Sequence, residues 1–136
     1  MTENDIALIR DSFAHLHRRK AETAQLFYDR LFEIAPEVRP LFKADIKAQG
    51  AKLMETLLVA IATLNDRDGL TILLEKLGRG HRAYHVEPTH YDHVGAALIW
   101  TLRTSLGTGF TPDIERAWTT LYGDIAATMI GAARAA

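Results

Sequence analysis

Hydrophobic residues recur at intervals of three and four positions along almost the whole chain, which is the spacing of amphipathic helices. In the first half the stripes comprise Ile6, Ile9, Phe13 and Leu16; Ala24, Phe27, Tyr28, Leu31 and Phe32; and Leu53, Leu57, Ile61 and Leu64. In the second half they comprise Leu70, Leu73, Leu74 and Leu77; Tyr91, Val94, Leu98, Leu102 and Leu106; and Ile114, Trp118, Leu121, Ile125 and Met129. No convincing run has the period of two that is typical of strands. The pattern predicts an all-α protein.

Cap and turn signals mark where these helices begin and end. Thr2 and Asp5 have the spacing of a capping box before the first helix. The dipeptide Ala35-Pro36 ends the second helix, because a residue before proline avoids the helical conformation. The other boundaries are a turn at 65–69, Pro88, and a break at 107–113 with Thr111 as N-cap. We see no repeat or linker, so we expect a single domain over residues 1–136.

Composition restricts the function further. A chain of 136 residues has the size of one ordinary domain, and 48% hydrophobic residues are typical of a globular protein. The formal charge of -1 gives no reason to expect nucleic acid or an anionic membrane as a partner. The chain has no cysteine, which excludes disulfides and iron–sulfur clusters. The acidic N-terminus does not resemble a signal peptide and no run has membrane-spanning length, so we expect a cytoplasmic protein.

Candidate chemistry is concentrated in the stretch LGRGHRAYHVEPTHY at residues 77–91. His81 continues the apolar face of Leu73 and Leu77, so its imidazole is expected to point into the protein. Its alternatives are a hydrogen-bonded core side chain or a metal ligand. His85 lies one helical turn later, and the pair has the spacing of a zinc chelate. The chain has no HExxH motif and no cysteine to complete such a site.

The other histidines carry less information. His90 and His93 follow Pro88 and belong to the next predicted helix. His15 and His17 lie in the basic segment HLHRRK, where we expect both side chains to be solvated.

Several spaced segments together resemble a known family. They are FYDRLF at 27–32, APEVRPLF at 35–42, Gln49, LGRGHRAYHV at 77–86, THYDHVG at 89–95 and AWTTLYGDIA at 117–126. Their order and separations resemble the globin family, in particular single-domain bacterial globins akin to the haem domain of flavohaemoglobins. The resemblance covers essentially the whole chain and implies a globin fold around a haem pocket.

The resemblance assigns the proximal side of that pocket. His81 corresponds to the ligand of the iron in a haem b. We expect its other ring nitrogen to donate to a carbonyl one turn earlier, that of Leu77. Phe42 corresponds to the aromatic residue that packs against the haem plane. Tyr91 corresponds to one member of a proximal hydrogen-bond network, and His85 is a further candidate for the pocket.

Two glycines and two basic residues have open interpretations. Gly78 and Gly80 each cost about 1 kcal/mol relative to alanine inside a helix. Either a close approach of the backbone to a macrocycle or a frayed or broken helix would explain them. Lys52 and Arg79 are candidates for contacts with the haem propionates.

The distal side determines which ligand is bound. Tyr28 corresponds to the family's distal tyrosine, and Gln49 stands where animal oxygen carriers have histidine. Both side chains are hydrogen-bond donors that suit bound dioxygen. Leu53 and Val94 are candidates for the apolar wall. The alternatives are a buried Tyr28 bonded to a backbone carbonyl and a solvated Gln49. We expect an open ferrous site, and a ferric site occupied by water or by Tyr28.

Departures from the flavohaemoglobin pattern favour binding over redox catalysis. The sequence contains no flavin or nicotinamide domain, and Ala133 stands about where those enzymes have a glutamate that polarises the proximal histidine. We therefore predict reversible, high-affinity binding of dioxygen and of carbon monoxide or nitric oxide. The alternative is an enzyme, a nitric-oxide dioxygenase or a nitrite or peroxide reductase, that works with a separate reductase. A gas sensor is a third possibility, but no output domain is present.

Overall fold

The computed structural model describes residues 1–42, 45–83 and 86–135, and this part of the chain contains helices and no strand. The predicted all-α class is therefore confirmed. The six α-helices are α1 (Glu3–His17), α2 (Lys20–Ile34), α3 (Ile46–Ala62), α4 (Arg67–Ala83), α5 (Pro88–Leu106) and α6 (Pro112–Ala135). Two 3-10 helices, η1 (Pro36–Leu41) and η2 (Gly107–Gly109), follow α2 and α5. No described helix is both long enough and apolar enough to cross a membrane.

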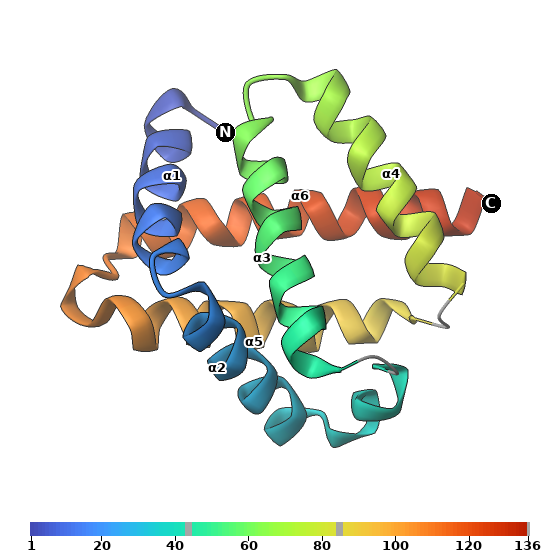
Figure 1. Ribbon diagram of the computed structural model, residues 1–136. Helices are drawn as coiled ribbons and strands as arrows, with labels where there is room; N and C mark the ends of the chain where they lie inside the picture. The colour runs from blue at the N-terminus through green and yellow to red at the C-terminus, as the bar shows by residue number, and fades with distance from the viewer. Residues whose placement is uncertain (43–44, 84–85, 136) are drawn as a thin grey trace.

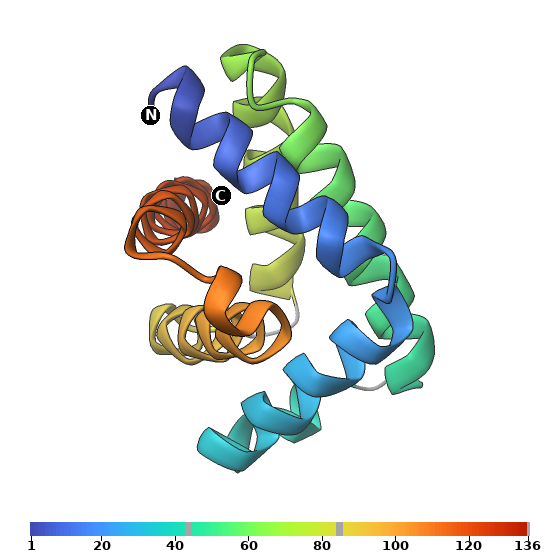
Figure 2. The ribbon, with the colours of Figure 1, turned by 90° about the vertical axis from the view of Figure 1, so that its left-hand side faces the viewer.

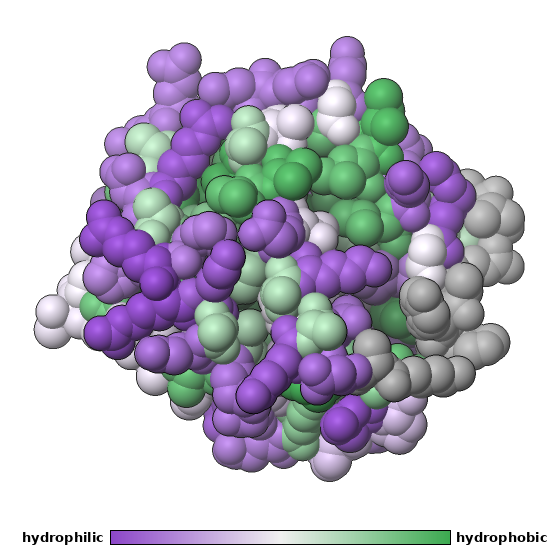
Figure 3. All heavy atoms as spheres, in the orientation of Figure 1, coloured by the Kyte–Doolittle hydropathy of each residue, from purple (hydrophilic) through white to green (hydrophobic). Residues whose placement is uncertain are grey.

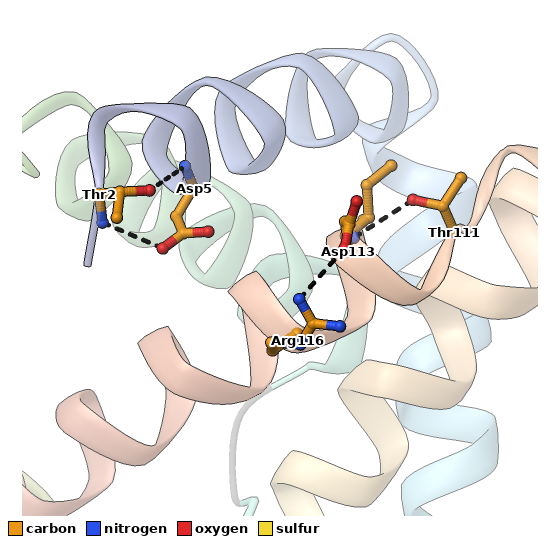
Figure 4. A network of polar contacts seen from close by, with 6 residues as sticks. Thr2, Asp5, Thr111, Asp113 and Arg116 are labelled. Atoms are coloured by element: carbon orange, nitrogen blue, oxygen red, sulfur yellow. Dashed lines mark hydrogen bonds and ion pairs between the residues drawn. The ribbon is translucent and has the colours of Figure 1, made fainter.

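The caps at two helix starts are those that the sequence predicts. The Thr2 hydroxyl accepts from the Asp5 N–H at 3.1 Å, and the Asp5 carboxylate accepts from the Thr2 N–H at 3.0 Å. At the start of α6 the Thr111 hydroxyl accepts from the Ile114 N–H at 3.3 Å (Figure 4). These bonds satisfy backbone donors that have no partner inside the helix.

The start of α4 differs from the prediction. The turn predicted at 65–69 is shorter, because the helix already begins at Arg67. Asp66 accounts for the difference, since its carboxylate accepts from the Gly69 N–H at 3.0 Å. This is the bond of an N-cap, and it draws Gly69 into the first turn of the helix.

The helices pack in two layers. Figures 1 and 2 show α5 and α6 side by side and antiparallel, with α3 and α4 crossing over them. The main contacts join α4 to α6, α2 to both α3 and α5, and α1 to α6. The largest apolar cluster is built around Trp118, whose side chain is 1% exposed. The indole N–H of Trp118 donates to the Ser12 hydroxyl at 2.8 Å, so the buried polar atom of the ring is satisfied.

The expectation that both early histidines are solvated is wrong for His17. The His15 side chain is exposed, but His17 is half-buried. The His17 ring lies 5.7 Å from the Phe13 ring, one helical turn earlier on the buried face of α1. Its Nε2 atom is buried and has no hydrogen-bond partner within the described part of the chain. The basic neighbours in the sequence conceal this position, because Arg18, Arg19 and Lys20 follow the end of α1 and are exposed, whereas His17 is its last residue.

Candidate functional site

Tyr28 lies inside a shell of aromatic rings. Its side chain is 2% exposed. Its ring lies 5.0 Å from Phe27, 5.8 Å from Phe32 and 5.4 Å from Phe42, measured between centroids. Phe42 also contacts Phe32 edge-on at 5.5 Å. These contacts connect α2 with the end of η1 and hold the Tyr28 ring in one place.

Gln49 reaches the same hydroxyl from α3. Its half-buried side chain forms a hydrogen bond with Tyr28. The next residue, Gly50, explains why the two helices come this close. A Cβ atom on Gly50 would lie only 2.8 Å from the Cβ of Ala24, so glycine permits the close crossing of α2 and α3. The structure thus brings together the two predicted distal residues.

The surroundings of Tyr28 keep its hydroxyl protonated. Burial raises the pKa of Tyr28 to about 12, although the hydrogen bond with Gln49 acts in the opposite direction. Tyr28 is therefore a neutral hydrogen-bond donor across the ordinary pH range.

The apolar residues predicted around the distal side pack together. Phe42, Leu53 and Val94 are half-buried and lie against the cluster that contains Tyr28 and Leu31. We call this group the Tyr28 cluster. Leu53 comes from α3, Val94 from α5 and Phe42 from the segment after η1. These three predicted residues therefore share a site with Tyr28.

His81 lies on the last turn of α4, and one of its ring nitrogens forms a hydrogen bond. Its Nδ1 lies 2.7 Å from the Leu77 carbonyl oxygen, one helical turn earlier. A carbonyl can only accept, so Nδ1 carries the proton and Nε2 carries the lone pair that a metal needs. The bond to Leu77 is the one that the sequence predicts. The half-buried His81 ring also lies 6.4 Å from the Tyr91 ring, measured between centroids.

A second tyrosine fixes the segment that carries Tyr91. The Tyr122 hydroxyl on α6 donates to the Tyr91 carbonyl at 2.5 Å. A Cβ on Gly95 would lie 2.7 Å from the Tyr122 ring, so glycine makes room for it. Burial raises the pKa of Tyr122 far above that of a free tyrosine. The sequence alone does not identify Tyr122 as a residue of the site. The available signal is Gly95, because a glycine inside a predicted helix indicates a close neighbour.

The close approach at Gly78 is not to a macrocycle. A Cβ atom on Gly78 would lie 2.3 Å from the Met129 carbonyl oxygen on α6. Glycine is therefore needed for the contact between α4 and α6. At Gly80 a Cβ atom would meet nothing within 4 Å, and α4 continues past both glycines to Ala83. The broken-helix interpretation is thus wrong for both.

The two sides of the site meet on α5. Val94 packs against the Tyr28 cluster, whereas Tyr91 belongs to a separate cluster with Leu74 and Met129, against which Leu77 packs. Tyr91 and Val94 are three residues apart, which is less than one helical turn. The residues around Tyr28 and those around His81 therefore flank one stretch of α5.

The remaining histidines play local roles or lie outside the described residues. His90 Nδ1 accepts from the Glu87 N–H at 2.9 Å at the start of α5. His93 lies 3.7 Å from the Glu37 carboxylate of η1. His85 lies outside the described residues. In the part of the chain that the structure covers, no group of three or more His, Asp or Glu side chains has the arrangement of a metal site.

Comparison with known proteins identifies the family. The sequence profile of the Globin family matches residues 25–129. Neuroglobin of Danio rerio is 30% identical over 143 residues, which cover 95% of this chain and 90% of that protein. The chain belongs to the globin family. The flavohemoprotein of Bacillus subtilis (strain 168) is also 30% identical, over 93% of this globin but only 32% of the flavohemoprotein.

A solved structure confirms the globin fold. The hexacoordinated heme protein from an anhydrobiotic tardigrade, solved at pH 4, superposes with a TM-score of 0.87 at 18% sequence identity. The match covers 98% of this globin and 96% of that chain. Membership of the globin family supports binding of haem and of a diatomic gas.

The residues of this globin fit a haem iron. Iron in proteins accepts an imidazole nitrogen as a single axial ligand. The bond from Nδ1 to Leu77 leaves His81 with the tautomer that such a ligand requires. The flat apolar faces of a macrocycle also suit the half-buried side chains of Phe42, Leu53, Leu77 and Val94.

Proposed function

We propose that this globin binds one haem b through His81 and holds dioxygen reversibly, with Tyr28 and Gln49 as hydrogen-bond donors. Two observations support the proposal: the buried Tyr28 hydroxyl has Gln49 beside it, and the Nδ1 atom of His81 already forms a hydrogen bond with Leu77. When bound, the haem supplies an iron centre with one position for a gas. Residues 1–136 then form one domain.

Tyr28 and Gln49 set how strongly each gas is held. A hydrogen bond with ionic character is worth roughly 1.5–3 kcal/mol, so one good donor slows the escape of dioxygen by about ten-fold or more. Carbon monoxide is a poorer acceptor and gains less from the same groups. The aromatic shell around Tyr28 keeps water away, which strengthens each hydrogen bond.

The distal residues also favour an open ferrous site. Gln49 is a poor metal ligand, and no histidine stands at its position to occupy the site from within. A pKa of about 12 for Tyr28 supports its action as a neutral donor rather than as an anionic ligand. We therefore infer five-coordinate ferrous iron before the gas binds.

The remaining residues shape the pocket. Phe42, Leu53 and Val94 form its distal wall, and Leu77 and Tyr91 support the His81 side. His85 stays a candidate for the same side. Arg79 on α4 is exposed, and we propose it as a partner of the haem propionates.

An enzymatic role is the second candidate, because the flavohemoprotein is as similar to this chain as neuroglobin is. Such an enzyme would convert nitric oxide, nitrite or peroxide with electrons from a separate reductase. Ala133 argues against strong catalysis of this kind, since its methyl group cannot polarise His81. Turnover of nitric oxide with an added flavin reductase, compared with the rate of spontaneous oxidation, decides between the two roles.

The optical spectrum of the purified protein tests the main proposal. We expect one haem b per chain, a five-coordinate ferrous spectrum after reduction with dithionite, and a stable carbon monoxide complex. A ferrous spectrum typical of two histidine ligands would contradict the open site. A protein that binds no added haem would contradict the proposal as a whole.

A further inference from the structure

The solvent-facing side of α3 is unusually apolar for an exposed helix face. Its exposed residues from the second turn onward are Ala48, Ala51, Lys52, Glu55, Leu58, Val59 and Ala62. Leu58 is 38% exposed and Val59 is 51% exposed. The exposed side of α2, by contrast, consists mostly of charged residues and includes Lys20, Glu22, Asp29 and Glu33. In Figure 3, hydrophobic side chains gather over α3 and the neighbouring α4. Exposed apolar side chains that gather on one helix face are typical of an interaction site.

The two charges on this face lack partners within the described residues. Lys52 and Glu55 form no ion pair there, whereas Arg30 and Glu33, which have the same spacing on α2, pair at 2.8 Å. One acidic and one basic side chain therefore remain for a partner that presents the opposite charges.

We propose that this partner is a second copy of the chain, and that two α3 helices pack antiparallel about a two-fold axis. When the axis passes between residues 53 and 54, Lys52 of one copy faces Glu55 of the other, and the same pair forms a second time by symmetry. In the same register Ala48 faces Val59 of the second copy. In this register small side chains face large ones, and each charged side chain faces one of opposite charge.

The self-complementary charges favour a second copy over an unrelated protein. A partner of single charge would attract one member of the Lys52 and Glu55 pair and repel the other. The contact is nevertheless small, because stable complexes bury about 1,200–2,000 Å² and one helix from each copy supplies less. The dimer should therefore dissociate reversibly on dilution. This inference does not depend on the proposed function, since neither a haem nor a gas takes part in the contact.

Sedimentation velocity over a wide range of protein concentrations tests the dimer. We expect the average sedimentation coefficient of the wild-type protein to rise from the monomer value toward the dimer value. Lys52→Glu and Glu55→Lys should each raise the dissociation constant at least ten-fold, because each places four like charges at the axis. Lys76→Glu is the matched control, since it reverses an exposed charge on α4, and it should dimerise as the wild type does.

Mixing the two single variants provides the decisive result. An equimolar mixture of Lys52→Glu and Glu55→Lys should form a heterodimer, because one copy then presents only acidic and the other only basic side chains. A wild-type protein that stays monomeric at all concentrations would overturn the proposal. So would single variants that dimerise normally, or a mixture that stays monomeric. Haem absorbance recorded in the same runs separates loss of the dimer from loss of haem.

Discussion

The Tyr28 side and the His81 side of the proposed pocket are held in different ways. Tyr28 is fixed by side chains, through three aromatic rings and a hydrogen bond with Gln49. His81 is fixed mainly by backbone, through the Leu77 carbonyl and the close contact of α4 with α6 at Gly78. Side chains can change without moving a helix, whereas a backbone contact cannot. Substitutions on the Tyr28 side should therefore alter gas binding, and substitutions on the His81 side should alter stability and haem retention.

Replacing His81 should have the largest effect. His81→Ala removes the nitrogen that we propose as the iron ligand, so the haem content of the purified protein should fall more than ten-fold. His90→Ala is the matched control, because His90 only caps the start of α5. The absorbance of extracted haem per mole of protein measures the haem content of both variants. A His81→Ala protein with a normal five-coordinate ferrous spectrum would contradict the assignment.

The two neighbouring glycines should respond in opposite directions. Gly78→Ala forces a Cβ atom against the Met129 backbone, which cannot move as a side chain would, so we expect a loss of about 1–3 kcal/mol in the free energy of unfolding. Gly80→Ala has open space and should stabilise α4 by up to about 1 kcal/mol. Chemical denaturation measures the free energy of unfolding of both variants. Equal effects would show that the contact between α4 and α6 is not specific to residue 78.

Local signals predict the helices well, because period and caps are properties of neighbouring residues. The stripes of apolar residues and the caps at Thr2 and Thr111 are all visible in the sequence. The start of α4 is not, because Asp66 can be read either as part of a turn or as a cap. The inward position of His17 is missed for a related reason, since its basic neighbours mask the apolar face that it shares with Phe13.

The arrangement of the site depends on contacts between residues far apart in the chain. The bond from His81 to Leu77 can be predicted, because both belong to one helix. The role of Tyr122 cannot, because its partners lie on a different helix. A glycine in a helix likewise signals a close neighbour without identifying it. At Gly78 that neighbour is the α6 backbone and not a macrocycle.

Removing the Tyr28 hydroxyl should distinguish polar from steric control of the pocket. Tyr28→Phe keeps the aromatic shell but removes the donor, so dioxygen should dissociate about ten-fold faster or more. Gln49→Leu should have a smaller effect in the same direction. Stopped-flow measurements with dioxygen and carbon monoxide test this, and carbon monoxide should change much less. Equal changes for both gases would show that the residues act by steric access.

The smallest expected effect is a loss of stability at alkaline pH caused by Tyr28. Its pKa is about 12 in the folded protein and about 10 in the unfolded chain. Between these values the unfolded chain has released the proton while the folded protein retains it, so rising pH favours unfolding. Below pH 10 both states are protonated, and Tyr28 does not affect the pH dependence. From pH 10 to pH 11 the free energy of unfolding should fall by about 1 kcal/mol through this residue. Tyr28→Phe should lose less stability over that interval in urea denaturation. An identical alkaline loss in both proteins would show that the Tyr28 hydroxyl is not held in the dry aromatic shell that its role as a neutral donor requires.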